Sequence, residues 1–306
     1  ISDSVSVKAW QGFQDNSDAT MTDLRTGLAW LKDASSSINN FGASSTQDNA
    51  VNFITQQNSD WRMPNFKELA SLFNYAFPTP GVGSGFENIK LEKYWSKSKR
   101  MINMPTWGIL PRYSAWPFDF INGKVEASYY SEGEDSALYP FMATKNQGIP
   151  GGLENDNFDF TDNTDGTVKD NKTGLMWLNA TLAQTISNRK NWNSAFNFAS
   201  NAVLCNDGTL QGTALVVGDC SNNGGVKYDD WRLPNVQELM EISKFENKAG
   251  VPQILPNLSL NVSYYWASTM FDDNNVWYVG DGVCFGSVLY RSKTGEEFNV
   301  QLARDP

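Results

Sequence analysis

The sequence predicts an α+β protein of two tandem domains, each with two helices flanking a small antiparallel sheet and long loops. Two repeated strings predict the duplication. DWRMPNFKEL at 60–69 matches DWRLPNVQEL at 230–239, and FQDNSDATMTDLRTGLAWL at 13–31 matches FTDNTDGTVKDNKTGLMWL at 160–178. The third observation is the order of elements in each copy, which runs strand, helix, helix, long loops and several strands. This order predicts the α+β class.

The boundary between the copies falls near NQGIPGG at 146–152, where Gly and Pro concentrate and apolar periodicity lapses. We therefore expect a first domain over 1–148 and a second over 149–306. A chain of 306 residues is long enough for two domains of ordinary size, and its 11 Trp, 11 Tyr and 18 Phe predict sizeable cores.

Each copy opens with an Asp- and Asn-rich turn, then a short strand, a turn at Thr-Gly and an apolar strand, GLAWL or GLMWL. A helix follows in each copy. Its apolar face consists of Ala50, Val51, Phe53 and Ile54 in the first copy and of Trp192, Ala195, Phe196 and Ala199 in the second. The second copy then carries a longer insertion at 201–229.

The repeated DWR string predicts the entrance of the second helix. Asn65 and Asn235 are N-cap residues, and Glu68 and Glu238 complete capping boxes three positions later. The Pro before each Asn keeps the chain extended ahead of the helix. Because both copies contain this string, we interpret it as a determinant of the fold rather than a binding site. We expect Arg232 to form a partly buried hydrogen-bonded pair.

Several aromatic strands are predicted to close each copy. The corresponding pairs are YWSKS (94–98) with YWAST (265–269), AWPFDFINGKV (115–125) with VWYVGDGVCFG (276–286), and LYPFMAT (138–144) with FNVQLAR (298–304). We expect hairpin turns at Asn122-Gly123 and at Asp281-Gly282.

Composition excludes several classes of function. The net charge is −10 and the Lys and Arg residues are scattered, which disfavours nucleic acids and strongly anionic glycans as ligands. The chain has no histidine, so Ser-His and Cys-His catalytic pairs and imidazole metal sites are excluded. No apolar run is long enough for a transmembrane segment. The opening ISDSVSVKAW suits a processed or truncated N-terminus, which leaves room for a removed signal or anchor.

The three cysteines suggest one disulfide. Cys205 and Cys220 flank the Gly- and Asn-rich CNDGTLQGTALVVGDC, and a bridge between them would indicate an oxidising compartment. Three reduced thiols are the alternative, because spacing alone does not establish a bridge. Cys284 is left over, and its role is open.

The Asp-rich turns have two interpretations. Hard oxygen ligands suit Ca²⁺, and Asp162, Asp165 and Asp170 are the candidate ligands in the second copy. The same side chains form Asx turns without an ion, and Thr161 and Lys172 stand where an EF-hand requires acids. We favour the structural turn, with no cofactor required.

The two Asp-rich turns differ at one position that matters for the backbone. Ala19 stands in the first copy where the second has Gly166, so the two turns need not share a conformation.

The motifs TDNTDGTVKDNKTGLMWL, DWRLPNVQEL, YYWAST and WYVGDG resemble the bacterial DUF1566 family, the domain at the C-terminus of the Legionella collagen-like adhesin. The second copy matches over nearly its whole length, and the first matches the same motifs more loosely. RLPN-x-x-EL is also similar to the RLPTEAEWEYA signature of formylglycine-generating-enzyme-like domains. The resemblance implies a C-type-lectin-like fold in each copy and a secreted or surface-exposed bacterial module for adhesion or ligand binding.

The resemblance supplies no catalytic residues. The formylglycine-generating enzymes act through two cysteines near the C-terminal end of the domain. In this chain only Cys284 lies in the corresponding region, and the first copy has no cysteine. We therefore expect a protein that is not an enzyme.

The loops between the aromatic strands are the expected binding surface. They are KRMINMPTWGILPRYSAW (99–116) in the first copy and MFDDNNVWYVGDG (270–282) with SVLYRS (287–292) in the second. Their Met, aromatic and Arg residues suit an adaptable contact surface. The candidate ligand-binding residues are Trp107, Arg112, Tyr113, Asp272, Asp273, Asn274, Tyr278, Asp281 and Tyr290. The alternative is that Trp116 and Trp277 belong to the core and the rest is ordinary loop.

Three functions follow from these patterns. The first is an extracellular bacterial adhesin that holds a glycan or protein ligand of another cell or surface without covalent chemistry. The second is a structural subunit or tip component of a surface filament or pilus, which self-assembles or is anchored through a segment before Ile1. The third is a carboxylate enzyme acting on glycans, for which Asp272, Asp273 and Asp281 are the nearest acids.

Overall fold

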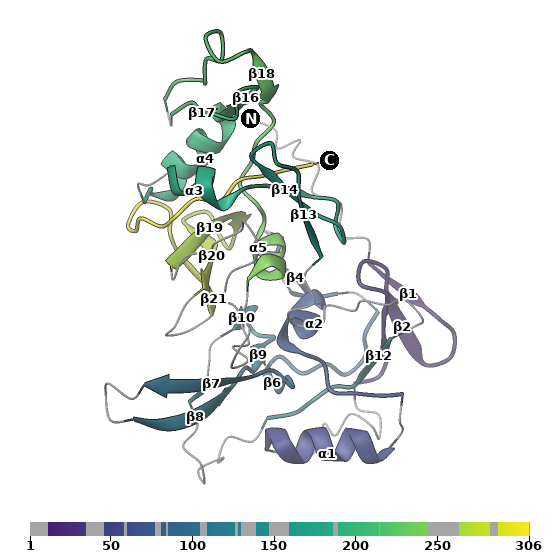
Figure 1. Cartoon of the computed structure of the whole chain (residues 1–306). Helices are drawn as coiled ribbons and strands as arrows, with labels where there is room; N and C mark the ends of the chain where they lie inside the picture. Colours follow the sequence, from purple (N-terminus) through teal and green to yellow (C-terminus); the bar gives the residue numbers. More distant parts are fainter. Residues whose placement is uncertain are drawn as a thin grey trace. The chain divides into compact units, whose positions relative to one another are not determined.

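The structure is a computed structural model (Figure 1). It describes residues 12–34, 46–57, 60–76, 81–83, 85–104, 109–125, 128–129, 139–146, 159–185, 189–213, 215–243, 263–281 and 287–305. The chain divides into two compact units, Ile1–Tyr75 with Thr79–Asn155 and Ala76–Pro78 with Asp156–Pro306. Both units mix helices with several small antiparallel sheets, so the α+β class is confirmed, whereas the expectation of one sheet per domain is wrong.

Both units open with the same four-stranded sheet. In the first unit it consists of β1 (Phe13–Asp15), β2 (Thr20–Asp23), β3 (Leu28–Leu31) and β12 (Thr144–Asn146). In the second it consists of β13 (Phe160–Asp162), β14 (Thr167–Asp170), β15 (Met176–Leu178) and β22 (Ala303–Arg304). The predicted strand–turn–strand opening is confirmed, and the last strand of each unit returns to pair with the third.

The closing strands are shorter than predicted. Before it joins the opening sheet, each terminal segment makes isolated bridges. One is a parallel bridge to the YW motif (94–98 or 265–269), at Trp95 with Phe141 and at Tyr265 with Asn299, and in the second unit Phe298 also makes an antiparallel bridge with Lys190. The segment therefore passes from one sheet to another, and only its last residues pair continuously.

The turn after β1 and the turn after β13 have the same backbone conformation, although one contains Ala19 and the other Gly166. Ser17 and Ala19 have φ values of 59° and 67°, and Thr164 and Gly166 have φ values of 58° and 92°. Asn16 N donates to Thr20 O, as its equivalent Asn163 does to Thr167 O. Ala19 therefore adopts the left-handed conformation, and the doubt raised by the Ala-for-Gly difference is not upheld.

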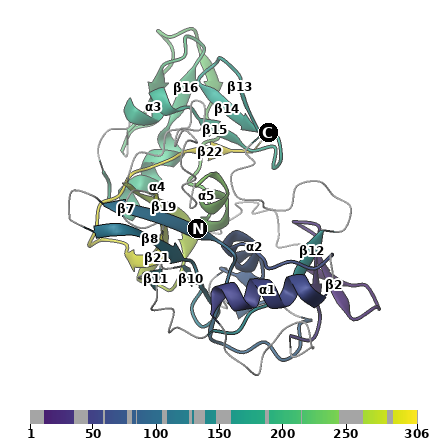
Figure 2. The same ribbon diagram turned by 60° about the horizontal axis from the view of Figure 1, so that its bottom comes forward.

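The helices of the first unit are α1 (Gln47–Gln57) and α2 (Phe66–Ser71), and those of the second are α3 (Ala180–Thr185), α4 (Trp192–Asn201) and α5 (Val236–Ile242). Figure 2 brings α1 forward. Helix α3 was not predicted; Asn179 begins it by accepting a hydrogen bond from Leu182 N.

The first helix that the sequence predicts in each copy, now α1 or α4, buries an apolar face, as expected. Ala50 and Ile54 of α1 are buried, while α4 buries Ala195, Ala199 and Phe198. Phe198 is buried in addition to the predicted face, while the predicted Trp192 and Phe196 are partly buried and pack against the same core cluster. The indole of Trp192 donates to Ala267 O at 2.8 Å.

The DWR string forms the same set of hydrogen bonds in both units, between an Arg, the N-cap Asn and a Glu. We call this set the lock. Glu68 accepts both arms of Arg62 at 2.8 and 2.6 Å and also accepts the N-cap amide of Asn65 at 2.8 Å. Glu238 does the same for Arg232, at 2.8 and 2.9 Å, and for the Asn235 amide at 2.7 Å. Both capping boxes and the predicted pairing of Arg232 are confirmed.

The lock is fastened to the YW motif that follows it in sequence. Ser98 accepts the first helical amide of α2, from Phe66 N, at 3.2 Å, and Thr269 accepts the equivalent amide of α5, from Val236 N, at 3.0 Å. The backbone carbonyls of the two motif prolines accept from Lys97 N and Ser268 N. The DWR string and the YW motif are therefore hydrogen-bonded to each other in both units.

The remaining strands of the first unit form small sheets. They are β4 (Phe73–Asn74) with β5 (Gly81–Val82); β6 (Lys93–Tyr94), β9 (Phe118–Asp119) and β10 (Lys124–Val125); and β7 (Lys99–Met104), β8 (Ile109–Ala115) and β11 (Ser128–Tyr129). The predicted turn at Asn122-Gly123 is confirmed, because it connects β9 to β10 with Gly123 at φ 69°.

The second unit contains the sheet that carries most of the candidate residues, β19 (Ser263–Met270), β20 (Asn275–Asp281) and β21 (Ser287–Ser292). Helix α4 contacts β19, and α5 contacts both β19 and β20. Trp266 and Tyr278 belong to the core cluster that includes Phe198 of α4. The sheet is thus held by helices and an aromatic core, which makes it a rigid platform for the turn at its end.

The largest buried side chains are tryptophans. Trp30, Trp95 and Trp116 in the first unit and Trp177, Trp266 and Trp277 in the second are all 0% exposed. The interpretation of Trp116 and Trp277 as core residues is therefore confirmed. Among the described residues, no helix is long and apolar enough to cross a membrane.

Candidate ligand-binding surface

The turn between β19 and β20 is shaped by Asp272. Its carboxylate accepts hydrogen bonds from Asn274 N at 2.7 Å and from Asn275 N at 2.8 Å. The Asn275 side chain donates to both carboxylate oxygens, at 3.0 and 2.9 Å. These bonds, led by that of the Asn275 side chain, hold the pKa of Asp272 below its usual value. Asp272 therefore positions the turn, while Asp273 and Asn274 are left exposed on it.

Two aromatic rings stack beside this turn. The rings of Phe271 and Tyr290 lie 3.7 Å apart and nearly parallel, at 5°. Both rest edge-on against the buried Trp277, each at 5.5 Å. Because Phe271 and Tyr290 are both partly exposed, this stack offers a ligand a fixed aromatic surface.

Lys293 joins the turn to the start of α4. Its ammonium donates to Asp273 O at 2.8 Å and lies 5.2 Å from the centre of the Trp192 ring. Its backbone accepts from Trp192 N at 3.1 Å and donates to Asn274 O at 3.0 Å. Cation, indole and turn are thus fixed relative to one another.

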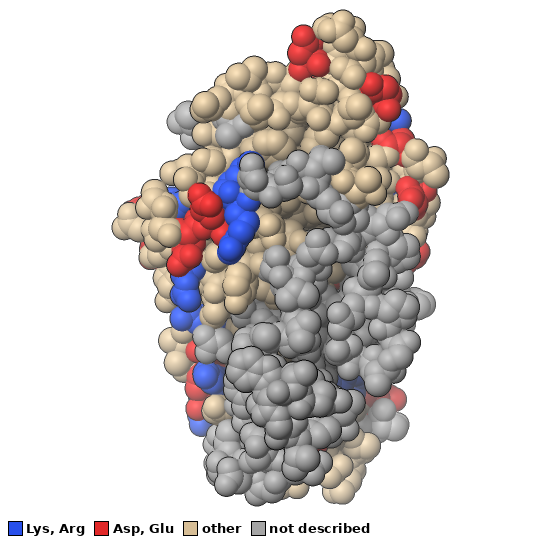
Figure 3. All heavy atoms as spheres, turned by 60° about the vertical axis from the view of Figure 1, so that its left-hand side comes forward, with Lys and Arg blue, Asp and Glu red and all other residues tan. Residues whose placement is uncertain are grey.

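These groups make up what we call the turn surface: Trp192, Phe271, Asp273, Asn274, Tyr290 and Lys293. It combines aromatic rings, a cation and exposed hydrogen-bonding groups at one end of the β19–β21 sheet. On the face drawn in Figure 3, cations and acids lie side by side in several places. The turn surface differs from those places in its stacked Phe271 and Tyr290 rings. Among the residues described, it carries no buried acid–base pair suited to covalent chemistry.

The structure places the other predicted residues of the second unit differently. Tyr278 is 3% exposed and packs in the core against Tyr264, Trp266 and Phe298. Asp281 is the last residue of β20, and its side chain lies outside the described part. Gly282 of the predicted turn and Cys284 lie outside the described residues as well.

The long stretch 99–116 of the first unit is a hairpin rather than a loop. Strands β7 and β8 pair antiparallel from Lys99 with Ala115 to Met104 with Ile109, and run side by side in Figures 1 and 2. Arg112 and Tyr113 lie on β8, but their side chains are outside the described part, as is the whole of Trp107. A binding role for these three residues stays a prediction.

The candidate calcium ligands are engaged in turns. Asp162 accepts from Thr164 N at 2.8 Å, Asp165 from Thr167 N at 3.0 Å, and Asp170 from Lys172 N at 2.9 Å. The equivalent Asp15 and Asp18 accept from Ser17 N and Thr20 N. These are the bonds of Asx turns. Across the described ranges, no group of three or more Cys, Asp or Glu side chains is arranged to hold a metal ion.

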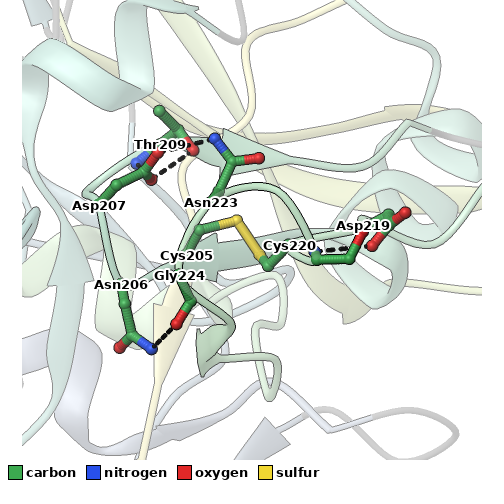
Figure 4. The surroundings of a disulfide bond; sticks show 9 residues. Cys205, Asn206, Asp207, Thr209, Asp219, Cys220, Asn223 and Gly224 are labelled. Carbon is green, nitrogen blue, oxygen red and sulfur yellow. Dashed lines mark hydrogen bonds between the residues drawn. A yellow bond between two sulfur atoms is a disulfide. The ribbon is translucent and has the colours of Figure 1, made fainter.

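The Cys205–Cys220 disulfide is present, with a Cα–Cα distance of 5.4 Å (Figure 4). It closes the insertion, whose strands β16 (Val203–Cys205), β17 (Leu210–Gln211) and β18 (Val226–Tyr228) form a separate small sheet. Asn206 donates to Gly224 O and Asn223 to Asp207, both at 2.7 Å. The insertion is therefore a cross-linked, hydrogen-bonded subdomain.

The base of the insertion is fixed to the scaffold by Arg304. The guanidinium donates to both oxygens of Asp230, at 2.6 and 3.0 Å, and lies 4.3 Å from the centre of the Tyr228 ring. The Tyr228 hydroxyl donates to Asp165 at 3.2 Å, and Lys227 forms an ion pair with the same carboxylate. Asp165 thus anchors the insertion as well as shaping its own turn.

The family of the chain follows from a comparison with protein-family models. The model of the Lcl C-terminal domain matches residues 19–139 and, separately, residues 166–304. The chain belongs to the Lcl C-terminal domain family. The two matches correspond to two tandem copies of the domain, in agreement with the predicted duplication. This is a family of adhesin-type domains. Neither the curated proteins nor the solved structures gave a match.

Within this Lcl C-terminal domain pair, three residues of the turn surface were missed from the sequence. Phe271 precedes the acidic pair of the turn, Trp192 was assigned only to the helix face, and Lys293 follows the last strand. Their proximity depends on pairing between β20 and β21 and on the docking of α4, which no local pattern reveals. The aromatic and acidic character of 270–274 and the aromatic segment 287–292 with Tyr290 pointed to this surface.

Proposed function

We propose that the chain is an extracellular bacterial adhesin that holds a glycan or protein ligand on the turn surface without covalent chemistry. The observation that carries this proposal is the Phe271–Tyr290 stack beside the exposed Asp273 and Asn274. Flat rings and adjacent polar groups, fixed before a ligand arrives, contribute contact area at little cost in conformational entropy. The adhesin-type family supports the same function.

The proposal extends to location and fold. The disulfide supports an oxidising compartment outside the cell. The order of strand, helix, helix and loop-connected strands, with the last strand of each unit paired to the third, supports a C-type-lectin-like fold. We further propose that binding requires no metal, because Asp162, Asp165 and Asp170 already serve as turn acceptors.

The second candidate function is a structural subunit of a surface filament. One observation favours it: the insertion exposes the adjacent aliphatic side chains of Leu215, Val216 and Val217. Exposed apolar clusters of this kind are typical of contacts between proteins.

The test is binding of the labelled chain to a glycan array and to a panel of purified extracellular proteins, with and without a chelator. The variant Phe271→Ala/Asp273→Ala/Asn274→Ala should lose binding, since it removes one ring and both exposed polar groups. The control Lys90→Ala/Glu92→Ala alters an exposed ion pair of the first unit and should bind normally. Undiminished binding by the turn variant would refute the site, and loss of binding with chelator would refute its independence from metals.

A further inference from the structure

The stacked rings of the turn surface lie on one face of the β19–β21 sheet, and the cation of the turn surface lies on the other. Tyr290 pairs with Trp277 across strands, and Phe271 contacts the same Trp277 ring. Lys293 lies over Trp192 of α4, and α4 packs against the opposite face. Among the described residues, no Lys or Arg lies over the Phe271 ring. This ring therefore offers a ligand apolar contact without a positive charge.

The backbone of the turn is already engaged within the turn. The carbonyls of Asp273 and Asn274 accept hydrogen bonds from Lys293, through its ammonium at 2.8 Å and its backbone amide at 3.0 Å. The amides of Asn274 and Asn275 donate to the Asp272 carboxylate. A peptide that binds as an added strand needs main-chain groups that are open to it. Recognition at this turn therefore depends on side chains.

The side chains of Asp273 and Asn274 are the polar groups that remain. Both residues are exposed, and neither their carboxylate nor their carboxamide has a hydrogen-bond partner among the described residues. An ionised carboxylate only accepts hydrogen bonds, whereas a carboxamide both donates and accepts. Adjacent hydroxyl groups of a sugar, each of which donates and accepts, complement this pair. Asp272 offers no comparable group, because its carboxylate is occupied by bonds within the turn.

Charge gives an ionic ligand no advantage over a neutral one at this turn. The exposed carboxylate of Asp273 disfavours uronic acids and sulfated sugars. A ligand cation would gain little from one exposed carboxylate in water. Cages that bind ammonium groups surround them with aromatic rings. Phe271 and Tyr290 stack on each other at 5° instead, so they form no such cage.

The spacing of these groups suits a small ligand. Consecutive Cα atoms are 3.8 Å apart, so the Cα atoms of Phe271 and Asn274 lie within about 11 Å of each other. One or two sugar units reach across that distance. A stable protein interface engages about 20–30 residues on each side, which is far more than the turn surface provides.

We propose that the turn surface binds a neutral hexopyranose of a glycan. A face of the sugar that carries only C–H groups packs on the Phe271 ring, and two adjacent hydroxyl groups hydrogen-bond with Asp273 and Asn274. No metal ion takes part, and no covalent bond forms or breaks. The inference rests on the proposed function, because it names the ligand class of the same surface.

The test is an NMR titration of the whole isotope-labelled chain with methyl β-galactoside, methyl β-glucoside and methyl α-mannoside. At least one of these neutral probes should shift the side-chain amide signals of Asn274 and the ring signals of Phe271. The uronide of the same sugar should bind roughly tenfold more weakly, because Asp273 repels its carboxylate. The 2-amino-2-deoxy form should bind no more tightly than the neutral parent. Added salt should leave the affinity for the neutral probe unchanged, because no ion pair contributes.

Variants separate the ring contact from the hydrogen bonds. Phe271→Ala, Asp273→Ala and Asn274→Ala should each weaken binding of the neutral probe by up to about tenfold. Phe271→Trp keeps a flat apolar ring and should retain binding. The matched control is Tyr264→Leu, which changes an aromatic residue that is 41% exposed at the other end of β19 and should bind as the wild type does. Melting temperatures of all variants show which of them remain folded.

Several results would overturn the inference. These are neutral probes that shift none of the signals, a charged form that binds more tightly than its neutral parent, and loss of binding with chelator. If array binding requires the turn surface but its ligands are proteins or anionic glycans, the adhesin proposal stands and this inference alone fails. If the array ligands bind the turn variant undiminished, the proposed binding site itself is wrong.

Discussion

Glu68 and Glu238 each hold three groups at once: the amide of the N-cap residue and both arms of an Arg. The carboxylate of Glu68 is 0% exposed, so its charge is stabilised only by these partners. The capping boxes and a pair for Arg232 were predictable from spacing. Spacing did not predict that one Glu serves both, because local pattern does not reveal that the Arg six positions earlier contacts the same carboxylate.

Replacing Arg62 by Met should therefore destabilise the first unit strongly. Leaving a buried carboxylate unpaired costs about 3–5 kcal/mol. The matched control is Lys32→Met, which breaks exposed ion pairs with Asp15 and Glu87 and should cost far less stability than Arg62→Met. Urea unfolding measures both, and equal losses in the two variants would contradict the role of the lock.

Ala19 adopts a left-handed backbone conformation, so replacing it by Gly should stabilise the first unit. An L-residue other than Gly pays about 1–2 kcal/mol in this conformation, so Ala19→Gly should stabilise the first unit by about 1 kcal/mol. The reciprocal Gly166→Ala should destabilise the second unit more than this, because the new Cβ would lie 2.7 Å from a methyl group of Leu182. Thermal unfolding measures both changes. Destabilisation by Ala19→Gly would show that the turn has a different backbone.

The pKa of Asp272 allows the structure of the candidate surface to be tested by changing the pH. Its pKa is held low by hydrogen bonds that are stronger to the ionised carboxylate, the first of them from the Asn275 side chain. The turn should therefore be stabilised above the ordinary Asp pKa of 3.8 and lose this stabilisation as pH falls through the lower folded value. In an NMR titration, Asn275→Ala should raise the pKa of Asp272 towards 3.8. An unchanged pKa would show that the Asn275 side chain does not hold the turn.

At the scale of elements, the repeated strings identified the opening hairpins, the second helices and the insertion, because each has a local pattern. The disulfide was anticipated from the two cysteines that flank the insertion. Local patterns did not reveal α3, the burial of Phe198 on α4, or the separation of the strands into several sheets. Those features depend on contacts between residues far apart in sequence, such as Trp192 with Ala267.

Removing the disulfide should loosen the insertion. Cys205→Ala/Cys220→Ala opens a loop with a sequence separation of 15, for which chain entropy predicts a loss of about 3 kcal/mol. Hydrogen exchange should locate the loss in β16–β18, and reduction of the wild type should reproduce it. A variant as stable and as protected as the wild type would show that the hydrogen bonds of the insertion suffice without the bridge.

At the scale of the whole molecule, the two units share a scaffold and differ in what they attach to it. The lock, the YW motif and the closing strand recur, while the first unit has the long β7–β8 hairpin and the second has the insertion and the short β19–β20 turn. Duplication was readable from sequence because scaffold residues are constrained by the same packing in both copies. Only part of the candidate surface could be predicted from the sequence, because its aromatic rings come from three separated segments.

Stability and recognition are therefore assigned to different parts of the molecule: the lock holds the fold, and we propose that the turn surface holds the ligand. The most direct test is array binding of Phe271→Ala/Asp273→Ala/Asn274→Ala, measured beside its melting temperature. We predict that every ligand bound by the wild type is lost while the variant unfolds within a few degrees of the wild type. A folded variant that still binds those ligands would contradict the assignment of binding to the turn surface and would place recognition elsewhere on the chain.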